Sequence, residues 1–478
     1  MPSAIANRRP WRDENAGPQW TIGRIVASAE SPQAVVGRIR WKRRYDVARH
    51  GDDWYVFDAQ SGPISGIHAY HGSPAVHDAI ERDDVGGVRP GARGAIATRP
   101  RSPDRSTGST TQGGVAMASI EVLESGHYRI APETALSDST HGDIPAFELV
   151  TARVRDSDGA QGVGYTFTVG RNGGAIAATL RREIAELLTG EQADDIARHW
   201  HRIWWALHYG GRGGAAVLAL SAADIALWDL KARRAGLPLW NLLGGFDPAV
   251  PCYAGGIDLQ LGVDELLAQT ERNLARGFRA IKMKVGRDRL SEDVERVRAM
   301  RERLGEDFPL MVDANMKWGI DEAIRAARAL RPFDPVWLEE PIVPDDPAGH
   351  ARVLREGGLP IAAGENLRSV WEFRQLIEAG AVSYPEPDVT NCGGVTAFMK
   401  IAHLAEAFNL PVTSHGAHEL TVHLLAACPN RSWLEAHGFG LDRYVAEPLS
   451  IVDGKAVAPQ RPGHGIEFDW AALERCRA

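Results

Sequence analysis

Three acidic residues each close a short apolar segment of the chain: Asp313 in PLMVDAN, Glu339 in VWLEEP and Glu365 in PIAAGEN. Successive members stand 26 residues apart, which is the length of one strand, one helix and two loops. Residues that end successive parallel strands meet at one face of the sheet. Three carboxylates that meet there repel one another unless a cation lies between them. Oxygen ligands suit a hard divalent ion, so the spacing predicts a site for Mg²⁺, with Mn²⁺ as the alternative.

The same rhythm continues on both sides of these acids. Five further polar residues end apolar segments of strand length: Lys282, Lys284, Asp388, His415 and Glu435. Between the segments lie helical patterns such as 321–331 and 395–408, in which apolar residues recur at spacings of three and four. Strands that alternate with helices indicate βα units and a parallel sheet. Polar groups at the carboxyl ends of such strands are typical of a TIM-type barrel.

In chain order, these motifs resemble the mandelate racemase subgroup of the enolase superfamily. The matching positions are Lys282, Lys284, Asp313, Asn315, Glu339, Glu365, Asp388, His415 and Glu435. The resemblance covers roughly residues 120–470 and includes the segment 221–245. It implies an α/β protein with an α+β capping domain over 117–245 and a modified TIM barrel over 246–440. A C-terminal tail, 441–478, should return to pack on the cap.

The resemblance also implies a reaction, in which the proton next to a carboxylate is removed and an enediolate forms. Mg²⁺ held by Asp313, Glu339 and Glu365 would stabilise the added negative charge. Lys284 would be a base on one face of the substrate carbon, and His415 the base on the other.

Three further residues support these bases. Asp388 would fix the tautomer of His415 and raise its basicity. Lys282 would contact the substrate carboxylate, and its positive charge should lower the pKa of Lys284. Glu435, protonated because burial raises its pKa, would donate a hydrogen bond to the enediolate. Asn315 is a further candidate donor to the substrate carboxylate.

Two outcomes of this chemistry remain open. Loss of a hydroxyl from the next carbon would convert an acid sugar, an aldonate or aldarate, into a 2-keto-3-deoxy acid. Return of the proton on the opposite face would make a racemase or epimerase of a 2-hydroxy acid. The cap loop 136–145 is dense in Ser, Asp, Thr and His and resembles that of galactarate and talarate dehydratases, which favours dehydration. His141, Tyr165 and Arg171, from the two expected cap loops (136–145 and 165–174), are candidate specificity residues.

Several polar residues near these motifs are expected to be structural. Strand alternation should turn Glu340 away from Glu339. His418, His423 and His437 are interpreted as structural or rim residues. Two other classes of protein fit less well: a zinc hydrolase would rely on several histidine ligands, and a non-catalytic binding protein would not retain both Lys284 and His415.

Composition limits the partners and the compartment. The 478 residues carry a formal net charge of −8, which argues against nucleic acid and anionic membranes as partners. A small anionic substrate is compatible, because the two lysines and the metal supply local positive charge. Four scattered cysteines without a CxxC motif and the lack of a run of transmembrane length indicate the cytoplasm. The resemblance also implies a homo-oligomer.

Residues 1–116 differ from the rest of the chain. They contain 15 Arg and a single Lys, with frequent Gly and Pro and little periodicity. We interpret this part as a disordered extension or as the product of a mis-assigned start, with Met117 as the true start. No catalytic residue is expected in it.

Overall fold

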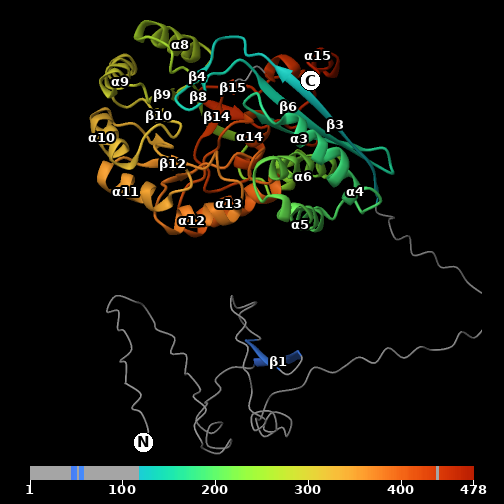
Figure 1. Cartoon of the computed structure of the whole chain (residues 1–478). Helices are drawn as coiled ribbons and strands as arrows, with labels where there is room; N and C mark the ends of the chain where they lie inside the picture. Colours follow the sequence, from blue (N-terminus) through green and yellow to red (C-terminus); the bar gives the residue numbers. More distant parts are fainter. Residues whose placement is uncertain (1–44, 51–52, 59–117, 438–440) are drawn as a thin grey trace, which may run out of the picture. The chain divides into compact units, whose positions relative to one another are not determined.

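The computed structural model describes residues 45–50, 53–58, 118–437 and 441–478 (Figure 1). Residues 1–112 and 113–478 are separate units. In the first unit, β1 (Tyr45–His50) and β2 (Asp53–Asp58) pair as an antiparallel hairpin. The other residues of the segment 1–116 lie outside the described residues, and so does Met117, the predicted start.

The second unit begins with an α+β cap. Its sheet has the antiparallel order β3-β6-β7, with β3 (Ile120–Ile130), β6 (Phe147–Asp156) and β7 (Gln161–Thr168). A small hairpin, β4 (Ser137–Asp138) and β5 (Gly142–Asp143), lies between β3 and β6 in the chain. The helices are α3 (Gly173–Thr179), the π-helix η1 (Leu180–Ile184), α4 (Ala185–Leu188), α5 (Ile196–Leu207), the 3₁₀ turn η2 (His208–Gly210), α6 (Gly214–Ala235) and α7 (Leu239–Leu242). The order of these elements matches the predicted capping fold.

Helix α6 packs very closely on the cap sheet. A Cβ atom at Gly162 of β7 would lie 2.2 Å from the Ala226 carbonyl oxygen, and one at Gly164 would lie 2.1 Å from that of Ala222. Only glycine permits this approach. Although α6 is long and mostly buried, no helix in the described part of the chain is both long and apolar enough to cross a membrane.

Parallel strands and covering helices form the barrel (Figure 1). The strands are β8 (Ala249–Gly255), β9 (Ile281–Lys284), β10 (Leu310–Asp313), β11 (Leu338–Glu339), β12 (Ile361–Ala363), β13 (Tyr384–Pro385) and β14 (Leu434–Ala436). The helices are α8 (Val263–Ala275), α9 (Leu290–Leu304), α10 (Ile320–Leu330), η3 (Arg331–Phe333), α11 (Pro347–Gly357), α12 (Val370–Glu378), α13 (Gly394–Ala407) and α14 (His418–Ala426). The register pairs Asp313 with Lys284 on one side and with Glu339 on the other, so three strand-end residues lie at one level.

The ring of strands closes through the segment that carries His415. β14 pairs in parallel with β8. On the other side, Thr413 N donates to Pro385 O of β13 at 3.0 Å, and Val412 forms a parallel bridge with Arg431. This segment therefore occupies the gap between β13 and β14.

The C-terminal segment returns to the cap, as predicted. It contains η4 (Leu441–Tyr444), β15 (Ile451–Val452), β16 (Lys455–Val457) and α15 (Trp470–Glu474). Arg129 N of β3 donates to Cys476 O at 2.7 Å, and Ala478 N donates to His127 O at 3.0 Å. His464 is buried, and its Nε2 lies 2.7 Å from Val163 O of β7.

Side chains of the cap hold the start of barrel helix α13. Thr396 donates to the buried Asp224 of α6 from its backbone N at 2.8 Å and from its hydroxyl at 2.6 Å. Gly393 N donates to Ser221 Oγ at 2.9 Å, and Trp200 Nε1 of α5 donates to Gly393 O at 2.7 Å. We call these contacts the α6–α13 clasp; they fix the loop that follows Asp388.

The clasp gives a prediction about stability. Burial raises the pKa of Asp224 to about 7, even though the Thr396 hydrogen bonds and Lys400 act in the opposite direction. Between the unfolded pKa, near 4, and pH 7 the folded chain therefore holds a proton that the unfolded chain releases, and stability falls as pH rises. Asp224→Asn keeps an acceptor for Thr396 N and a group that can bond its hydroxyl, but has no charge to bury. The melting temperature of Asp224→Asn minus that of the wild type should therefore increase as the pH is raised from 4.5 to 7.5.

Thermal unfolding across this pH range measures the effect. The exposed Asp264→Asn serves as the matched control and should follow the wild-type curve. If the Asp224→Asn and wild-type curves ran parallel, the buried carboxyl would not titrate in this range.

Candidate active site

The three predicted metal ligands converge. Asp313 ends β10, Glu339 ends β11 and Glu365 follows β12 by two residues, and one carboxylate oxygen of each lies within 4.8 Å of the others. Asp313 and Glu339 are fully buried. Burial raises the pKa of Glu339 to about 8, assisted by the charge of Asp313. Burial acts in the same direction on Asp313, but two neighbouring lysines outweigh it and lower the pKa to about 2. A compact set of carboxylates is the kind of site that Mg²⁺ accepts.

Two buried lysines face these acids. Lys282 Nζ lies 2.5 Å from Glu339 Oε1, 2.7 Å from Glu435 Oε1 and 3.4 Å from Asp313 Oδ2. Lys284 Nζ lies 2.5 Å from Asp313 Oδ2. The prediction of a lowered pKa for Lys284 is wrong for this arrangement, although the effect of Lys282 itself has the predicted direction. Burial and Lys282 do act in that direction, but the carboxylates, Asp313 foremost, outweigh them and raise the pKa of Lys284.

The backbone of Lys284 is fixed by a buried ion pair. Lys284 N donates to Asp258 Oδ1 at 2.9 Å, and Arg296 Nη1 donates to Lys284 O at 2.7 Å. Arg296 Nη2 also donates to Asp258 O at 2.9 Å. The lysine therefore projects from a rigid strand end, which favours precise placement of a base.

His415 and Asp388 form the predicted pair. His415 Nδ1 lies 2.8 Å from Asp388 Oδ2, while Thr390 donates to Asp388 Oδ1 from its backbone N at 2.7 Å and its hydroxyl at 2.6 Å. The other ring nitrogen, Nε2, lies 3.2 Å from Glu365 Oε2. Burial lowers the pKa of His415, but Glu365, Glu435 and Asp388 outweigh burial and raise it to about 10. Lys284 thus borders the acid trio at Asp313, and His415 borders it at Glu365.

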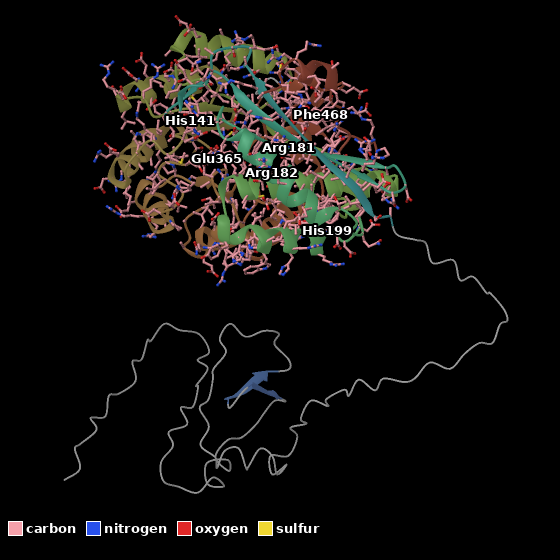
Figure 2. All side chains as sticks on the ribbon, turned by 45° about the vertical axis from the view of Figure 1, so that its right-hand side comes forward. His141, Arg181, Arg182, His199, Glu365 and Phe468 are labelled. Carbon is pink, nitrogen blue, oxygen red and sulfur yellow. The ribbon has the colours of Figure 1, made fainter. Side chains whose placement is uncertain are left out.

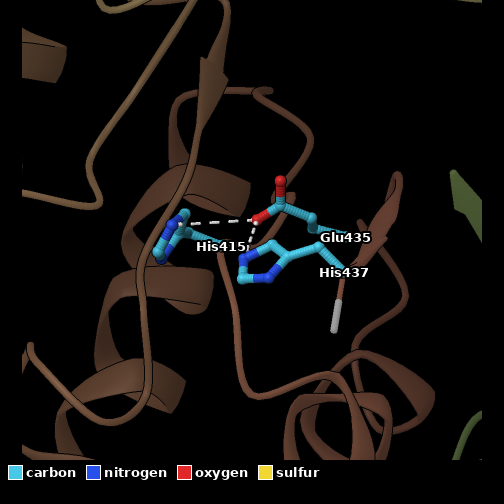
Figure 3. A group of neighbouring side chains, drawn as sticks. All are labelled: His415, Glu435 and His437. Carbon is cyan, nitrogen blue, oxygen red and sulfur yellow. Dashed lines mark ion pairs between the residues drawn. The ribbon is translucent and has the colours of Figure 1, made fainter. Parts of the chain in front are cut away.

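Glu435 contacts a lysine and two histidines, and the two histidines are drawn beside it in Figure 3. Its Oε1 contacts Lys282, and its Oε2 lies 3.2 Å from His437 Nε2 and 3.8 Å from His415 Nε2. Gly416 N also donates to Oε2 at 3.0 Å. The expectation of a raised pKa is wrong here. Burial acts in that direction, but Lys282, His437 and His415 outweigh it and hold the pKa well below its usual range.

His437 was interpreted as a structural or rim residue, but it belongs to the site. It is buried, and its ring centroid lies 5.5 Å from that of His415. The signal for it was present in the sequence: His437 stands two positions after Glu435, just past the end of β14, so strand alternation predicts that both side chains point to the same face.

The first cap loop lies across the mouth of the barrel. Ser139 Oγ donates to Ala314 O at 2.5 Å, and the Thr140 hydroxyl donates to Asn315 O. Asn315 is buried, has φ of 40° and donates its backbone N to Asp313 Oδ1 at 2.9 Å. Its side-chain oxygen has no hydrogen-bond partner among the described residues. Asn315 is therefore placed beside the acids, as a substrate contact would require.

His141 projects from the same loop on the side of the barrel where Glu365 lies (Figure 2). It is half-exposed, and its Nδ1 lies 2.8 Å from Asp138 Oδ2. The hydrogen bond to Asp138 raises the pKa of His141, against burial, and Glu365 adds to the effect. The structure thus brings this predicted substrate residue to the rim of the site.

The second cap segment differs from the prediction. Tyr165 does not lie in a loop, because β7 continues to Thr168; the side chain is fully buried and its hydroxyl donates to Glu419. Phe167, two residues further on, is the side chain that β7 presents to His415, with ring centroids 6.5 Å apart. Arg171 is exposed.

Other polar residues near the site make structural contacts. Glu340 is fully buried, and Asn366 Nδ2 donates to its Oε2 at 2.8 Å and to Glu365 Oε1 at 3.2 Å. His418 contacts two acids, Glu419 and Asp442, at 3.5 and 3.7 Å. His423 Nε2 lies 2.9 Å from a backbone carbonyl of the C-terminal segment, and burial lowers its pKa to about 3.

Comparisons with known proteins agree with this geometry. Residues 131–244 match the mandelate racemase / muconate lactonizing enzyme N-terminal domain, and residues 265–472 match the enolase C-terminal domain-like family. The chain is 57% identical over 356 residues to a 3,6-anhydro-alpha-L-galactonate cycloisomerase of Streptomyces coelicolor, covering 74% of this chain and 99% of the relative. It is 40% identical over 329 residues to the L-talarate/galactarate dehydratase of Salmonella typhimurium, covering 68% of this chain and 81% of the relative.

A solved structure matches as well. The crystal structure of a racemase from Streptomyces coelicolor A3(2) with bound magnesium superposes with a TM-score of 0.74 at 56% identity, covering 75% of this chain and 100% of that one. Sequence, fold and strand-end residues therefore agree: the chain belongs to the mandelate racemase/muconate lactonizing enzyme family of the enolase superfamily, in which a cap is joined to a TIM barrel.

Proposed function

We propose that the chain is a Mg²⁺-dependent enzyme that removes the proton next to the carboxylate of an acid sugar and then expels the oxygen on the neighbouring carbon. The observation that carries this proposal is the pair Lys284 and His415, which border one trio of carboxylates from two sides. A base and an acid at fixed positions around one anion-binding centre are what this elimination needs.

The metal would be held by Asp313, Glu339 and Glu365, whose oxygens are close enough together for one ion. When bound, it supplies positive charge that stabilises the negative charge developing on the substrate carboxylate. Lys282, whose Nζ lies between Glu339 and Glu435, is placed to contact the same carboxylate. Asn315, whose side-chain oxygen has no hydrogen-bond partner within the described part of the chain, could orient a substrate hydroxyl with that oxygen.

The protons move through the two flanking residues. One of Lys284 and His415 takes the proton from the carbon next to the carboxylate, and the other gives a proton to the oxygen that leaves the next carbon. Asp388, held by Thr390, keeps the imidazole of His415 oriented. The enol that remains rearranges to a 2-keto-3-deoxy acid.

The product of this elimination depends on whether the leaving oxygen is a free hydroxyl or part of a ring. A free hydroxyl leaves as water, which is dehydration. In a 3,6-anhydro sugar acid the oxygen on carbon 3 belongs to a ring, so the C3–O bond breaks, the oxygen stays as a hydroxyl on carbon 6, and the mass does not change. The 57% identity over 99% of a 3,6-anhydro-galactonate cycloisomerase favours ring opening. The 40% identity to a talarate/galactarate dehydratase and the polar loop at Ser139 and Thr140 support dehydration as the second candidate.

The test is to incubate the full chain and Mg²⁺ with 3,6-anhydro-L-galactonate, L-talarate, galactarate and a simple 2-hydroxy acid, in D₂O for NMR and, in parallel, in H₂O for mass spectrometry. NMR detects exchange of the proton next to the carboxylate, and mass spectrometry detects the product. A keto acid of unchanged mass supports ring opening, and one lighter by a water supports dehydration. Inversion without a keto acid would make the chain a racemase, and no exchange with any of these acids would overturn the proposal.

A further inference from the structure

The floor of the site contains a tryptophan that has no part in the chemistry above. Trp337 stands two residues before Glu339, so the two side chains leave β11 and its approach on the same face. Both are fully buried, and Trp337 Nε1 donates a hydrogen bond to Glu339 Oε2 at 2.9 Å. The indole N–H therefore binds a carboxylate of the metal trio from beneath.

The indole ring has little freedom to move. It meets Tyr253 edge-on, with centroids 5.6 Å apart and an interplanar angle of 76°, and it lies 5.0 Å from the ring of Tyr384. Trp337 and Tyr253 belong to a small buried cluster with Ala280, Met311 and Ala362. Tyr253 is itself fixed, because its hydroxyl donates to the buried Glu386 at 3.2 Å. The donor is thus held by packing before any ligand arrives.

The carboxylate of Glu339 needs such a donor. Its second oxygen lies 2.5 Å from Lys282 Nζ, so the group is held at both oxygens. The Glu339 carboxylate lies beside Asp313 and Glu365, and repulsion by their negative charges favours rotation of this carboxylate away from them. A hydrogen bond from a neutral N–H to a buried carboxylate stabilises the charged form and fixes the plane of the group. In metal sites, loss of a partner that holds a ligand in place typically costs about 10- to 100-fold in metal affinity or activity.

We propose that Trp337 is a positioning residue for the metal, which holds Glu339 in the orientation that binds Mg²⁺. This inference rests on the proposed function in one respect, namely that Asp313, Glu339 and Glu365 bind the ion. It goes further in assigning a role to a side chain that touches neither metal nor substrate.

The test compares two changes at position 337. Trp337→Phe removes the N–H and part of the ring. Replacing Trp337 by 3-benzothienylalanine, which has sulfur where tryptophan has N–H, removes the donor and keeps the size of the ring. The matched control is Trp240→Phe, because Trp240 is half-buried and its Nε1 has no hydrogen-bond partner among the described residues. Isothermal titration of each metal-free protein with MgCl₂, without substrate, gives the Kd. Circular dichroism and melting in EDTA report the fold.

Both changes at Trp337 should raise the Kd for Mg²⁺ by about 10- to 100-fold, while the control keeps the wild-type value. An unchanged Kd for Mg²⁺ in the benzothienyl protein overturns the inference. If only Trp337→Phe binds Mg²⁺ more weakly, the smaller ring explains the weaker binding, and the inference is again overturned. If the wild-type protein does not bind Mg²⁺, the proposed function fails instead. The two failures are therefore distinguishable.

Discussion

Replacing either Lys284 or His415 by alanine should reduce product formation by about 10²- to 10⁴-fold, the range expected when a positioned acid or base is lost. Each residue borders the acid trio on its own side, and no other described lysine contacts Asp313 except Lys282, which is already engaged with Glu339 and Glu435. Neither residue can therefore replace the other. Turnover of the preferred substrate measures the loss.

The two variants should differ in proton exchange. The variant that lacks the base should lose exchange of the substrate proton in D₂O together with product. The variant that lacks only the acid should retain exchange, because the carbon–hydrogen bond can still break and re-form. The exposed residues Lys455 and His403 provide controls, Lys455→Ala and His403→Ala, which should behave as wild type. Near-normal turnover in either Lys284→Ala or His415→Ala would remove that residue from the mechanism.

Removal of the divalent ion should abolish turnover and leave the fold intact. Without the ion, the ammonium groups of Lys282 and Lys284 still neutralise Asp313, Glu339 and Glu435 at short range. EDTA should therefore stop the reaction, and Mg²⁺ should restore it. Because Mg²⁺ binds only the folded chain, the ion should also raise the melting temperature, and at 100 times its Kd it contributes about 2.7 kcal/mol.

A single ligand can be removed in place of the ion. Glu365→Gln keeps the size of the side chain and its place beside His415, but loses one of the three charges proposed to hold the cation. Its Kd for Mg²⁺ should rise and its turnover should fall with it. The exposed Glu302→Gln changes the net charge equally and should alter neither. Full activity of the wild-type protein in EDTA would contradict the predicted loss of turnover without the ion, and it would also contradict the proposed function.

The positions of the site residues could be predicted from the sequence because a strand end is a local feature. An apolar run that stops at a polar residue, repeated every 26 residues, leaves few arrangements other than a ring of strands. Asp313 and Glu339 end β10 and β11 as expected, and the pairing of Asp313 with Lys284 follows from a parallel register.

The charge states could not be predicted, because they depend on contacts between strands that are not neighbours. Glu435 comes from β14, and the lysine that lowers its pKa comes from β9. The role of Trp337 could not be predicted for the same reason. Strand alternation shows only that its side chain points inward, and not that it donates a hydrogen bond to Glu339. The expected loop position of Tyr165 rests on the resemblance to the family's second cap loop, whereas β7 continues to Thr168, and Gly162 and Gly164 of this strand make room for α6.

The α6–α13 clasp has a consequence for chimeric proteins and for the evolution of new specificities. Ser221 and Asp224 of the cap accept hydrogen bonds from the backbone amides of Gly393 and Thr396, which belong to the barrel, so opening the cap would expose these barrel amides. Those amides should exchange with solvent as slowly as α6 does, as parts of one cooperative unit. A foreign cap grafted onto this barrel would therefore need Ser221 and Asp224, as well as suitable loops, because without them the start of α13 would lose these hydrogen bonds.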